Sequence, residues 1–384
     1  MARRLKAAMP EHTHIARLAG DEFVVLDGTV QSLAEAHRLA DKVLALFREP
    51  IHVGVGDMYV MASIGVAVAP RDAVDAQELQ RNADTALCRA KESGGNCVQV
   101  FDDAMFERVF HRLEIESGLH RALERRELHL YYQPIVDLLT GEVHGFEALM
   151  RWQRPDGRII SPAEFIPVAE DTGLIVGIGN WALLEALTQL RTWIDEGVCA
   201  RSATMSVNVS PRQLQDPSLY SAVDEALRRS GVSPRNVWLE VTESVMISDP
   251  DQALAALRRL RGLDVRLAID DFGTGYSSLG MLRRFPLQRI KIDRSFITGM
   301  NQDESANSLV RTIVAMAKSL NLDLVAEGLE SKDQLRELTA MGCRKAQGFL
   351  IASPVQAGLM RETVLNLDTS GLWTGGRQLS LPND

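Results

Sequence analysis

Seven polar residues stand where apolar, strand-like runs end, and their types suggest metal-dependent chemistry. Five are carboxylates, one is an amide and one is a lysine: Glu147, Asn208, Glu240, Asp270, Asp271, Lys291 and Glu327. Ending buried strands on neighbouring acids is costly because like charges repel one another. A bound divalent cation, or a pair of them, would remove that cost. The adjacent aspartates suit two ions, since one carboxylate can bridge both while its neighbour binds one.

The available ligand atoms indicate the kind of metal. All eight histidines lie at or before His144, so the strand ends after it offer oxygen ligands almost exclusively. Oxygen ligands favour hard ions such as Mg²⁺ or Mn²⁺ over zinc. An oxygen-lined site for two metals with a nearby lysine is a common arrangement for phosphate-ester hydrolysis.

Each of these residues has a simpler interpretation when it is taken alone. A single strand-end acid, such as Glu147 or Glu327, usually caps a helix or lies on the surface. Asn208 alone would be a turn residue, and Lys291 alone would be a solvated strand end. The complete set favours a site, because chance does not place seven such groups on successive strand ends.

The elements that would bring these residues together begin at Glu127. From there, β-branched apolar runs alternate with amphipathic helical patterns. The strand-like runs are LHLYYQPIVD, VHGFEALMRW, ATMSVNVS, NVWLEVTES, VRLAIDDFG, RIKIDRSF, LDLVAEGLE and KAQGFLIAS. This rhythm predicts an α/β fold, a (β/α)8 TIM-like barrel whose strand ends surround one mouth. Only LLTGE joins the first two runs, which is too short for a helical crossover, so we expect an antiparallel first strand.

Composition divides the chain into four parts. Residues 1–101 alternate short strand and helix patterns, which predicts a separate α/β piece. Residues 102–126 are polar with a helical period, which predicts a linking helix. The barrel is expected over 127–365, and 366–384 is expected to form a loose tail.

Overall composition limits the partners and the compartment. The chain of 384 residues has a formal net charge of −9 at pH 7, which disfavours a broad grip on a nucleic-acid polymer. Four cysteines are scattered without close pairing, so a reduced, cytoplasmic compartment fits best. No run approaches the ~20 apolar residues of a membrane span. A membrane anchor elsewhere in a longer parent protein is compatible with this sequence.

Taken together, the motifs resemble those of the EAL-domain phosphodiesterases, bacterial signalling enzymes that cleave cyclic di-GMP. EALMRW matches the motif that names the family, and further matches follow in order: SVNVS, LEVTES, IDDFGTGYSSL, IKIDRSF, VAEGLE and QGFLIASP. The resemblance covers roughly residues 109–365 and implies the barrel with an antiparallel first strand. It also implies a hydrolase that converts cyclic di-GMP to linear pGpG.

The resemblance assigns roles to individual residues. Lys291 would hold the attacking water, and Glu327 would be a candidate to accept its proton. Contacts to the substrate would come from Gln133, Arg151 and Gln347. Two Mg²⁺ or Mn²⁺ ions would be bound by Glu147, Asn208, Glu240, Asp270, Asp271 and Glu327.

Two glutamates in LEVTES are expected to differ in role. Strand side chains alternate, so Glu240 faces the barrel mouth together with Thr242. Glu243 falls just past the strand, where it can reach the GTGYSS loop that follows the paired aspartates. The resemblance agrees that Glu243 supports catalysis by anchoring that loop.

The first block resembles the C-terminal part of a GGDEF domain, the fold of diguanylate cyclases. RLAGDEFVVL carries Ala19 where the family has the first glycine of a pair, and the later segments SIGVAVAP and RNADTALCRAKESGGN also match. The family's first strand, which supplies a metal aspartate and phosphate contacts, would lie before residue 1. Cyclase activity is therefore not expected, and Asp21 and Glu22 are expected to be solvated turn residues.

Two other functions are compatible with the sequence. A receptor that binds cyclic di-GMP without cutting it would have lost metal ligands or altered the loop after the paired aspartates, and this chain keeps both. A signalling module whose barrel mainly dimerises is the second alternative. A homodimer through the barrel is expected alongside catalysis.

Overall fold

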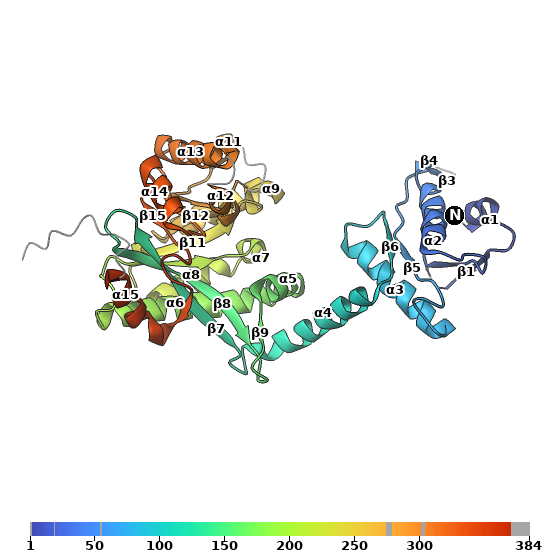
Figure 1. The fold of residues 1–384 in the computed structure, drawn as a ribbon, viewed down its shortest axis with the longest axis horizontal. Helices are drawn as coiled ribbons and strands as arrows, with labels where there is room; N and C mark the ends of the chain where they lie inside the picture. Colours follow the sequence, from blue (N-terminus) through green and yellow to red (C-terminus); the bar gives the residue numbers. More distant parts are fainter. Residues whose placement is uncertain (1, 19, 54–55, 274–278, 301–303, 370–384) are drawn as a thin grey trace, which may run out of the picture. The chain divides into compact units, whose positions relative to one another are not determined.

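A computed structural model describes residues 2–18, 20–53, 56–273, 279–300 and 304–369. The chain divides into two compact units, Met1–Ile115 and Glu116–Asp384 (Figure 1). The division falls inside helix α4, which spans Asp103–Ala122 and occupies most of the segment in which a linking helix was expected.

The N-terminal unit is built from short helices and strands. Its elements before α4 are α1 (Ala2–Ala8), β1 (His14–Arg17), β2 (Phe23–Leu26), α2 (Leu33–Ala45), β3 (Ile51–Val53), β4 (Gly56–Met58), β5 (Ile64–Val66), α3 (Ala76–Glu92) and β6 (Val98–Val100). The strands pair as β1–β2, β3–β4 and β5–β6, and only the last pair is parallel. Asp21 and Glu22 are exposed at the turn between β1 and β2, whereas Ala19 lies outside the described residues.

In the described part of the second unit, eight strands close a barrel. They are β7 (Leu128–Asp137), β8 (Val143–Gln153), β10 (Thr204–Asn208), β11 (Val237–Thr242), β12 (Arg266–Phe272), β13 (Arg289–Ile292), β14 (Asp323–Ala326) and β15 (Lys345–Ala346). Neighbours from β8 to β15 are parallel. Strand β7 is antiparallel to β8 and to β15, which it joins to close the barrel. The predicted fold, including its antiparallel first strand, is therefore confirmed.

Helices cover the outside of this barrel (Figure 1). They are α5 (Pro162–Thr172), α6 (Ile175–Asp195), α7 (Pro211–Gln215), α8 (Leu219–Ser230), α9 (Val245–Ser248), α10 (Pro250–Arg261), α11 (Leu279–Arg284), α12 (Arg294–Gly299), α13 (Glu304–Ser319), α14 (Lys332–Met341) and α15 (Met360–Thr369). Two short strands extend the sheet, β9 (Ile159–Ile160) beside β8 and β16 (Val355–Gln356) beside β7. The tail expected from residue 366 thus begins inside α15, and 370–384 lie outside the described residues. None of the described helices is both long and apolar enough to cross a membrane.

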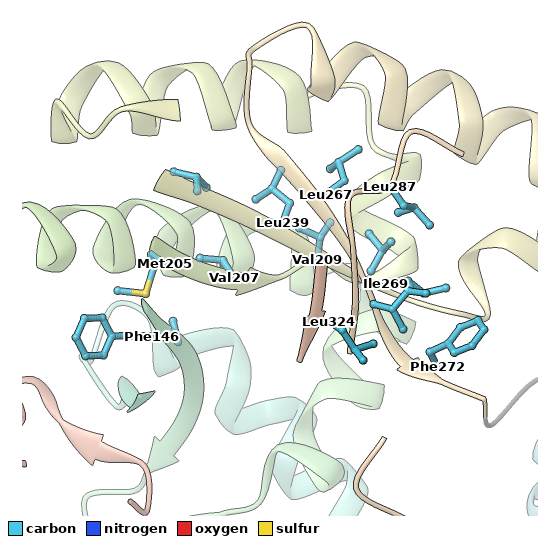
Figure 2. Packing of buried hydrophobic residues seen from close by; sticks show 14 of the residues in the cluster. Phe146, Met205, Val207, Val209, Leu239, Leu267, Ile269, Phe272, Leu287 and Leu324 are labelled. Atoms are coloured by element: carbon cyan, nitrogen blue, oxygen red, sulfur yellow. The ribbon is translucent and has the colours of Figure 1, made fainter. Parts of the chain in front are cut away.

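Side chains along each barrel strand alternate between an outer apolar core and the barrel interior, which bears the polar residues. Figure 2 shows Leu239 of β11 with Leu267 and Ile269 of β12 in the apolar cluster that joins the strands to the helices. Because side chains alternate along a strand, Glu240 and Asp270 point to the opposite side, into the barrel. The outer core fixes the strands, and the strands in turn fix the direction of these acids.

Candidate active site

The ends of the barrel strands bring the predicted acids together. Carboxylate oxygens of Glu147, Glu240 and Asp270 lie within 4.8 Å of one another, and all three side chains are buried. A second group of the same size contains Asp270, Asp271 and Glu327. Asp270 belongs to both groups, which is the position that a bridging carboxylate would take.

Lys291 lies at the centre of this acid cluster and is fully buried. Its Nζ is 2.6 Å from Glu240 Oε2 and 2.6 Å from Glu327 Oε1. It is 3.1 Å from Asp270 Oδ1 and 3.3 Å from Glu147 Oε2. One cation therefore serves four carboxylates, with Asp271 as a fifth acid beside them. The cluster carries a surplus of negative charge when every group is ionised.

The surplus of negative charge contributes to shifts in the pKa values of the acids. Burial, reinforced by the charges of Glu147 and Asp270, raises the pKa of Glu240 to about 7 even though Lys291 pulls it down. Burial and the charge of Asp270 raise the pKa of Asp271 to about 6. Burial also raises the pKa of Glu327 well above its ordinary value. Without a further cation, these groups hold protons that exposed carboxylates would release.

Glu147 differs from its neighbours because two amides support its charge. Burial works to raise its pKa, but Lys291 and hydrogen bonds from Gln347 and Asn208 lower it overall. Asn208 Nδ2 donates to Glu147 Oε1 at 2.9 Å, and Gln347 Nε2 donates to Glu147 Oε2. Gln347 Nε2 also donates to Glu327 Oε1 at 3.0 Å. The structure thus places both amides inside the acid cluster, where their nitrogens orient Glu147.

Asp271 stands on a strained backbone. Its φ is +52°, in the left-handed region, where a residue other than glycine costs on the order of 1–3 kcal/mol. Its amide nitrogen donates to Asp270 Oδ1 at 3.0 Å, which ties the two acids together. Strain of this kind persists where the surroundings enforce it, and here it turns two consecutive carboxylates towards one space.

Two predicted substrate contacts lie beside the cluster. Gln133 on β7 is the register partner of Glu147, is buried, and donates from Nε2 to the carbonyl of Ala352 at 2.9 Å. Arg151 is four residues beyond Glu147 on β8 and therefore faces the same side. Its guanidinium carbon lies 5.7 Å from the ring centre of Tyr131.

The two glutamates of LEVTES are separated as expected. Glu240 reaches Lys291 inside the mouth, whereas Glu243 lies past β11 and is buried. Glu243 Oε2 accepts a hydrogen bond from the amide of Gly273 at 3.0 Å. Gly273 is the last described residue before 274–278, which lie outside the described residues. Glu243 therefore fixes the point at which that loop begins.

Sequence reasoning missed Asp293, which follows β13. It lies close enough to Asp271 to raise the pKa of that acid, and its own Oδ1 caps α12 by accepting from the amide of Ser295 at 2.9 Å. The available signal was its place two residues after Lys291, at another strand end.

The donor set fits a hard divalent cation. The grouped ligand atoms are carboxylate oxygens, which suit Mg²⁺ or Mn²⁺. Glu240 Oε1 is buried and has no hydrogen-bond partner among the described residues. A buried carboxylate oxygen without a partner, in a cluster with surplus negative charge, is where a cation would bind.

Comparisons with known proteins agree with this arrangement. Residues 116–354 match the family model for the EAL domain, and residues 1–97 match the model described as diguanylate cyclase, GGDEF domain. The bifunctional diguanylate cyclase/cyclic di-GMP phosphodiesterase MucR of Pseudomonas aeruginosa is 41% identical over 93% of this chain and 52% of its own length. The cyclic di-GMP phosphodiesterase PdeR of Escherichia coli is 40% identical over 90% of this chain and 52% of its own length.

Solved structures include a similar barrel with a bound nucleotide. The PaMucR phosphodiesterase in its c-di-GMP complex is 44% identical, with a TM-score of 0.62 over 64% of this chain and 99% of that one. The chain spans about half the length of the two curated relatives.

Proposed function

The chain belongs to the EAL domain family, and on that premise we propose that it is a metal-dependent phosphodiesterase that hydrolyses cyclic di-GMP to linear pGpG. The observation that carries the proposal is the buried cluster of oxygen ligands around Lys291. Relatives named as cyclic di-GMP phosphodiesterases, at about 40% identity, support the choice of substrate.

Two Mg²⁺ or Mn²⁺ ions are the proposed cofactors. Bound here, they would polarise the phosphoryl oxygens and offset the charge that develops during hydrolysis. The residues that would hold them are Glu147, Asn208, Glu240, Asp270, Asp271 and Glu327.

The chain's own residues supply the proton chemistry in this proposal. Lys291 Nζ donates a hydrogen bond to the attacking water and orients it. Glu327 accepts a proton from that water as the water oxygen bonds to phosphorus; the phosphorus–oxygen ester bond breaks, and the released sugar oxygen takes up a proton from solvent.

Three residues are proposed to contact the substrate. Gln133 and Arg151 face the side of the sheet that carries Glu147, and Arg151 offers the planar donors that suit phosphate or a guanine edge. Gln347 has a buried Oε1 with no partner among the described residues, so it can accept a hydrogen bond from a ligand. Glu243 supports the site by holding the amide of Gly273.

A receptor that binds cyclic di-GMP without cutting it is the alternative. The enzyme is favoured because all the carboxylates of the proposed site are present and gathered around Lys291. A cytoplasmic location and a homodimer through the barrel complete the proposal.

The deciding experiment incubates the purified chain with cyclic di-GMP and follows pGpG by chromatography. We expect turnover with Mg²⁺ or Mn²⁺, none in excess EDTA, and little with Ca²⁺, which prefers longer bonds and more ligands. Undiminished turnover in EDTA would remove the metal from the proposal. Binding of cyclic di-GMP without any pGpG under all metals would favour the receptor.

The N-terminal unit is proposed to make no cyclic di-GMP. Its match to the GGDEF model covers residues 1–97, and Asp21 and Glu22 lie exposed at the turn between β1 and β2. Incubation with GTP and Mg²⁺, with the phosphodiesterase site inactivated by Glu240→Ala, should give no cyclic product. Formation of cyclic di-GMP by that variant would contradict this part of the proposal.

A further inference from the structure

Among the buried side-chain atoms that have no hydrogen-bond partner in the described residues, four come from neighbouring positions of β10, β11 and β13. They are Ser206 Oγ, Trp238 Nε1, Arg289 Nη1 and Glu240 Oε1. Each of these four residues is at most 2% exposed. A buried polar group without a partner costs roughly 1–3 kcal/mol, so four of them in one region require an explanation.

The four residues occupy neighbouring interior positions. Ser206 on β10 is the register partner of Trp238 on β11, and Asn208 and Glu240 form the next interior pair along the same strands. The guanidinium carbon of Arg289 lies 3.7 Å from the centre of the Trp238 ring. Arg289 is also two residues before Lys291 on β13, so both face the interior.

Glu240 and Arg289 are near enough to influence each other. Burial lowers the pKa of Arg289, while the charges of Asp323 and Glu240 act to raise it. Arg289 Nε donates to Asp323 Oδ2 at 2.9 Å, and Nη2 lies 2.8 Å from the same oxygen. Neither Nη1 nor Nη2 makes a hydrogen bond with the described residues, although Nη2 approaches Asp323 as an ion pair.

The chemistry of the four atoms indicates what lies between them. The indole and guanidinium nitrogens can only donate, a serine hydroxyl can donate or accept, and the carboxylate oxygen can only accept. A water molecule can accept from two donors and donate to Glu240 Oε1, and buried waters typically make about three such bonds. A small anion fits less well, since it would lie beside Glu240 and the other carboxylates.

We propose that a buried water links Arg289, Trp238 and Ser206 to Glu240, and that Arg289 is through it a positioning residue for this metal ligand. The inference rests on the proposed metal site. Glu240 Oε1 has two lone pairs, so it can bind a metal and accept the hydrogen bond of the water at once. Hydrogen bonds to a metal-binding carboxylate orient it, and their loss typically weakens metal binding by ~10–100-fold.

The ion pair between Arg289 and Asp323 decides whether loss of Arg289 should weaken or strengthen metal binding. Removing a cation near a metal site would by itself strengthen metal binding. The Arg289 charge is offset by Asp323, however, and Lys345 Nζ donates to both oxygens of Asp323 at 2.8 and 2.9 Å. Replacing Arg289 by methionine therefore leaves Asp323 paired, and the main change near Glu240 is the lost hydrogen bond.

The test measures Mn²⁺ binding to the whole chain without substrate, by electron paramagnetic resonance of the free ion. Arg289→Met should weaken Mn²⁺ binding by ~10–100-fold, and Arg289→Lys should recover part of the loss. Arg266→Met is the matched control, because the Arg266 guanidinium carbon also lies over the Trp238 ring, at 5.3 Å, but none of its nitrogens is buried without a partner. This control should bind Mn²⁺ like the wild type.

Each outcome separates this inference from the proposed function. A wild-type chain that binds no Mn²⁺ would overturn the metal site itself. Wild-type binding with unchanged affinity in Arg289→Met, or an equal loss in Arg266→Met, would overturn only the role of Arg289. If Arg289→Met does not fold, Ser206→Ala decides the question, since it removes one hydroxyl and almost no volume. A high-resolution crystal structure with no water at this position would also overturn the inference.

Discussion

The two ends of the barrel carry opposite surpluses of charge. At the mouth, five carboxylates gather around Lys291. At the end where the strands begin, Asp323 is the acid between Arg289 and Lys345, with Arg266 stacked nearby over Trp238. Arg289 and Lys291 lie only two residues apart on β13, so one strand contributes to both patterns.

The two ends of the barrel differ in the burial of their charged side chains as much as in the sign of their charge. The side chains of Asp323 and Lys345 are 27% and 15% exposed, so water can solvate the surplus there. At the mouth the side chains of Glu147, Glu240 and Lys291 are 4% exposed or less, and those of Asp270 and Glu327 are 11% and 14% exposed, so water reaches only the rim of the acid cluster. A surplus of charge therefore marks a ligand site only where it is buried.

The largest expected effect is a difference in activity between variants of Glu240 and Glu243, two acids at the mouth. Glu240→Ala removes a metal ligand and should be inactive at any Mg²⁺ concentration. Glu243→Ala removes the acceptor for the Gly273 amide and should lose about 10–100-fold, with part of the activity recovered at high Mg²⁺. The measurement is a Mg²⁺ titration of both variants at saturating cyclic di-GMP. If both variants respond to Mg²⁺ in the same way, the assignment of Glu240 as a metal ligand and Glu243 as a loop anchor is wrong.

A smaller effect compares the lysines at the two ends. Lys291→Met leaves four carboxylates, three of them buried, without their cation and should cost about 3–5 kcal/mol of unfolding free energy in EDTA. Mn²⁺ should recover part of that loss. Lys345→Met leaves Asp323 paired with Arg289 and should cost about 1 kcal/mol or less, with or without Mn²⁺.

Urea unfolding of both variants, with and without the metal, makes this comparison. Equal costs for the two lysines would contradict the contrast drawn between the buried and the solvated end. A Lys291→Met cost that Mn²⁺ leaves unchanged would also count against it.

The smallest expected effect is in the pH dependence of stability without metal. The folded-state pKa is raised from 4.5 to about 7 for Glu240 and from 3.8 to about 6 for Asp271, in both cases mainly by burial. Between pH 4.5 and 7 the folded chain therefore binds more protons at the mouth than the unfolded chain does. The mouth's contribution to the unfolding free energy should fall as the pH rises through this window.

The other end opposes this trend. Burial, with Lys345 and Arg289 nearby, lowers the pKa of His144 from 6.5 to about 4, so its contribution rises with pH over that interval. In EDTA, Glu240→Gln should flatten the fall in stability and His144→Gln should steepen it. Urea titrations across the window would measure both slopes, and the opposite pair of changes would refute the assignment.

The barrel and its mouth could be predicted because their signals are local in the sequence. The short segment LLTGE is enough to indicate that β7 is antiparallel to β8, and an acid directly after an apolar run indicates a strand end. The same kind of local reasoning separated Glu240 from Glu243, by alternation and by the position of Glu243 past the end of the strand. Each of these inferences needs only a few consecutive residues.

The hydrogen bonds inside the barrel could not be predicted in this way. Gln347 donates to Glu147 across 200 positions of the sequence, and that contact exists only once the barrel is closed. Arg289 reads as an ordinary polar residue near the start of a strand. Its complete burial depends on Trp238 and Asp323, which come from other strands.

The position of β7 also has a consequence for synthesis of the chain. Strand β7 is the first barrel strand to be synthesised, and β15, the last, must pair with it to close the barrel. Asp137 pairs in register with Lys345, and Arg344 binds the Asp137 carboxylate across 207 positions of the sequence. At roughly 5–20 residues per second, a ribosome needs on the order of 10–40 s to cover that distance. Until then the nascent sheet has two open edges, β7 and β14, which can pair with other chains. We therefore expect misassembly during expression to depend on how soon β15 emerges, so slower translation of the last third of the barrel should lower the soluble yield.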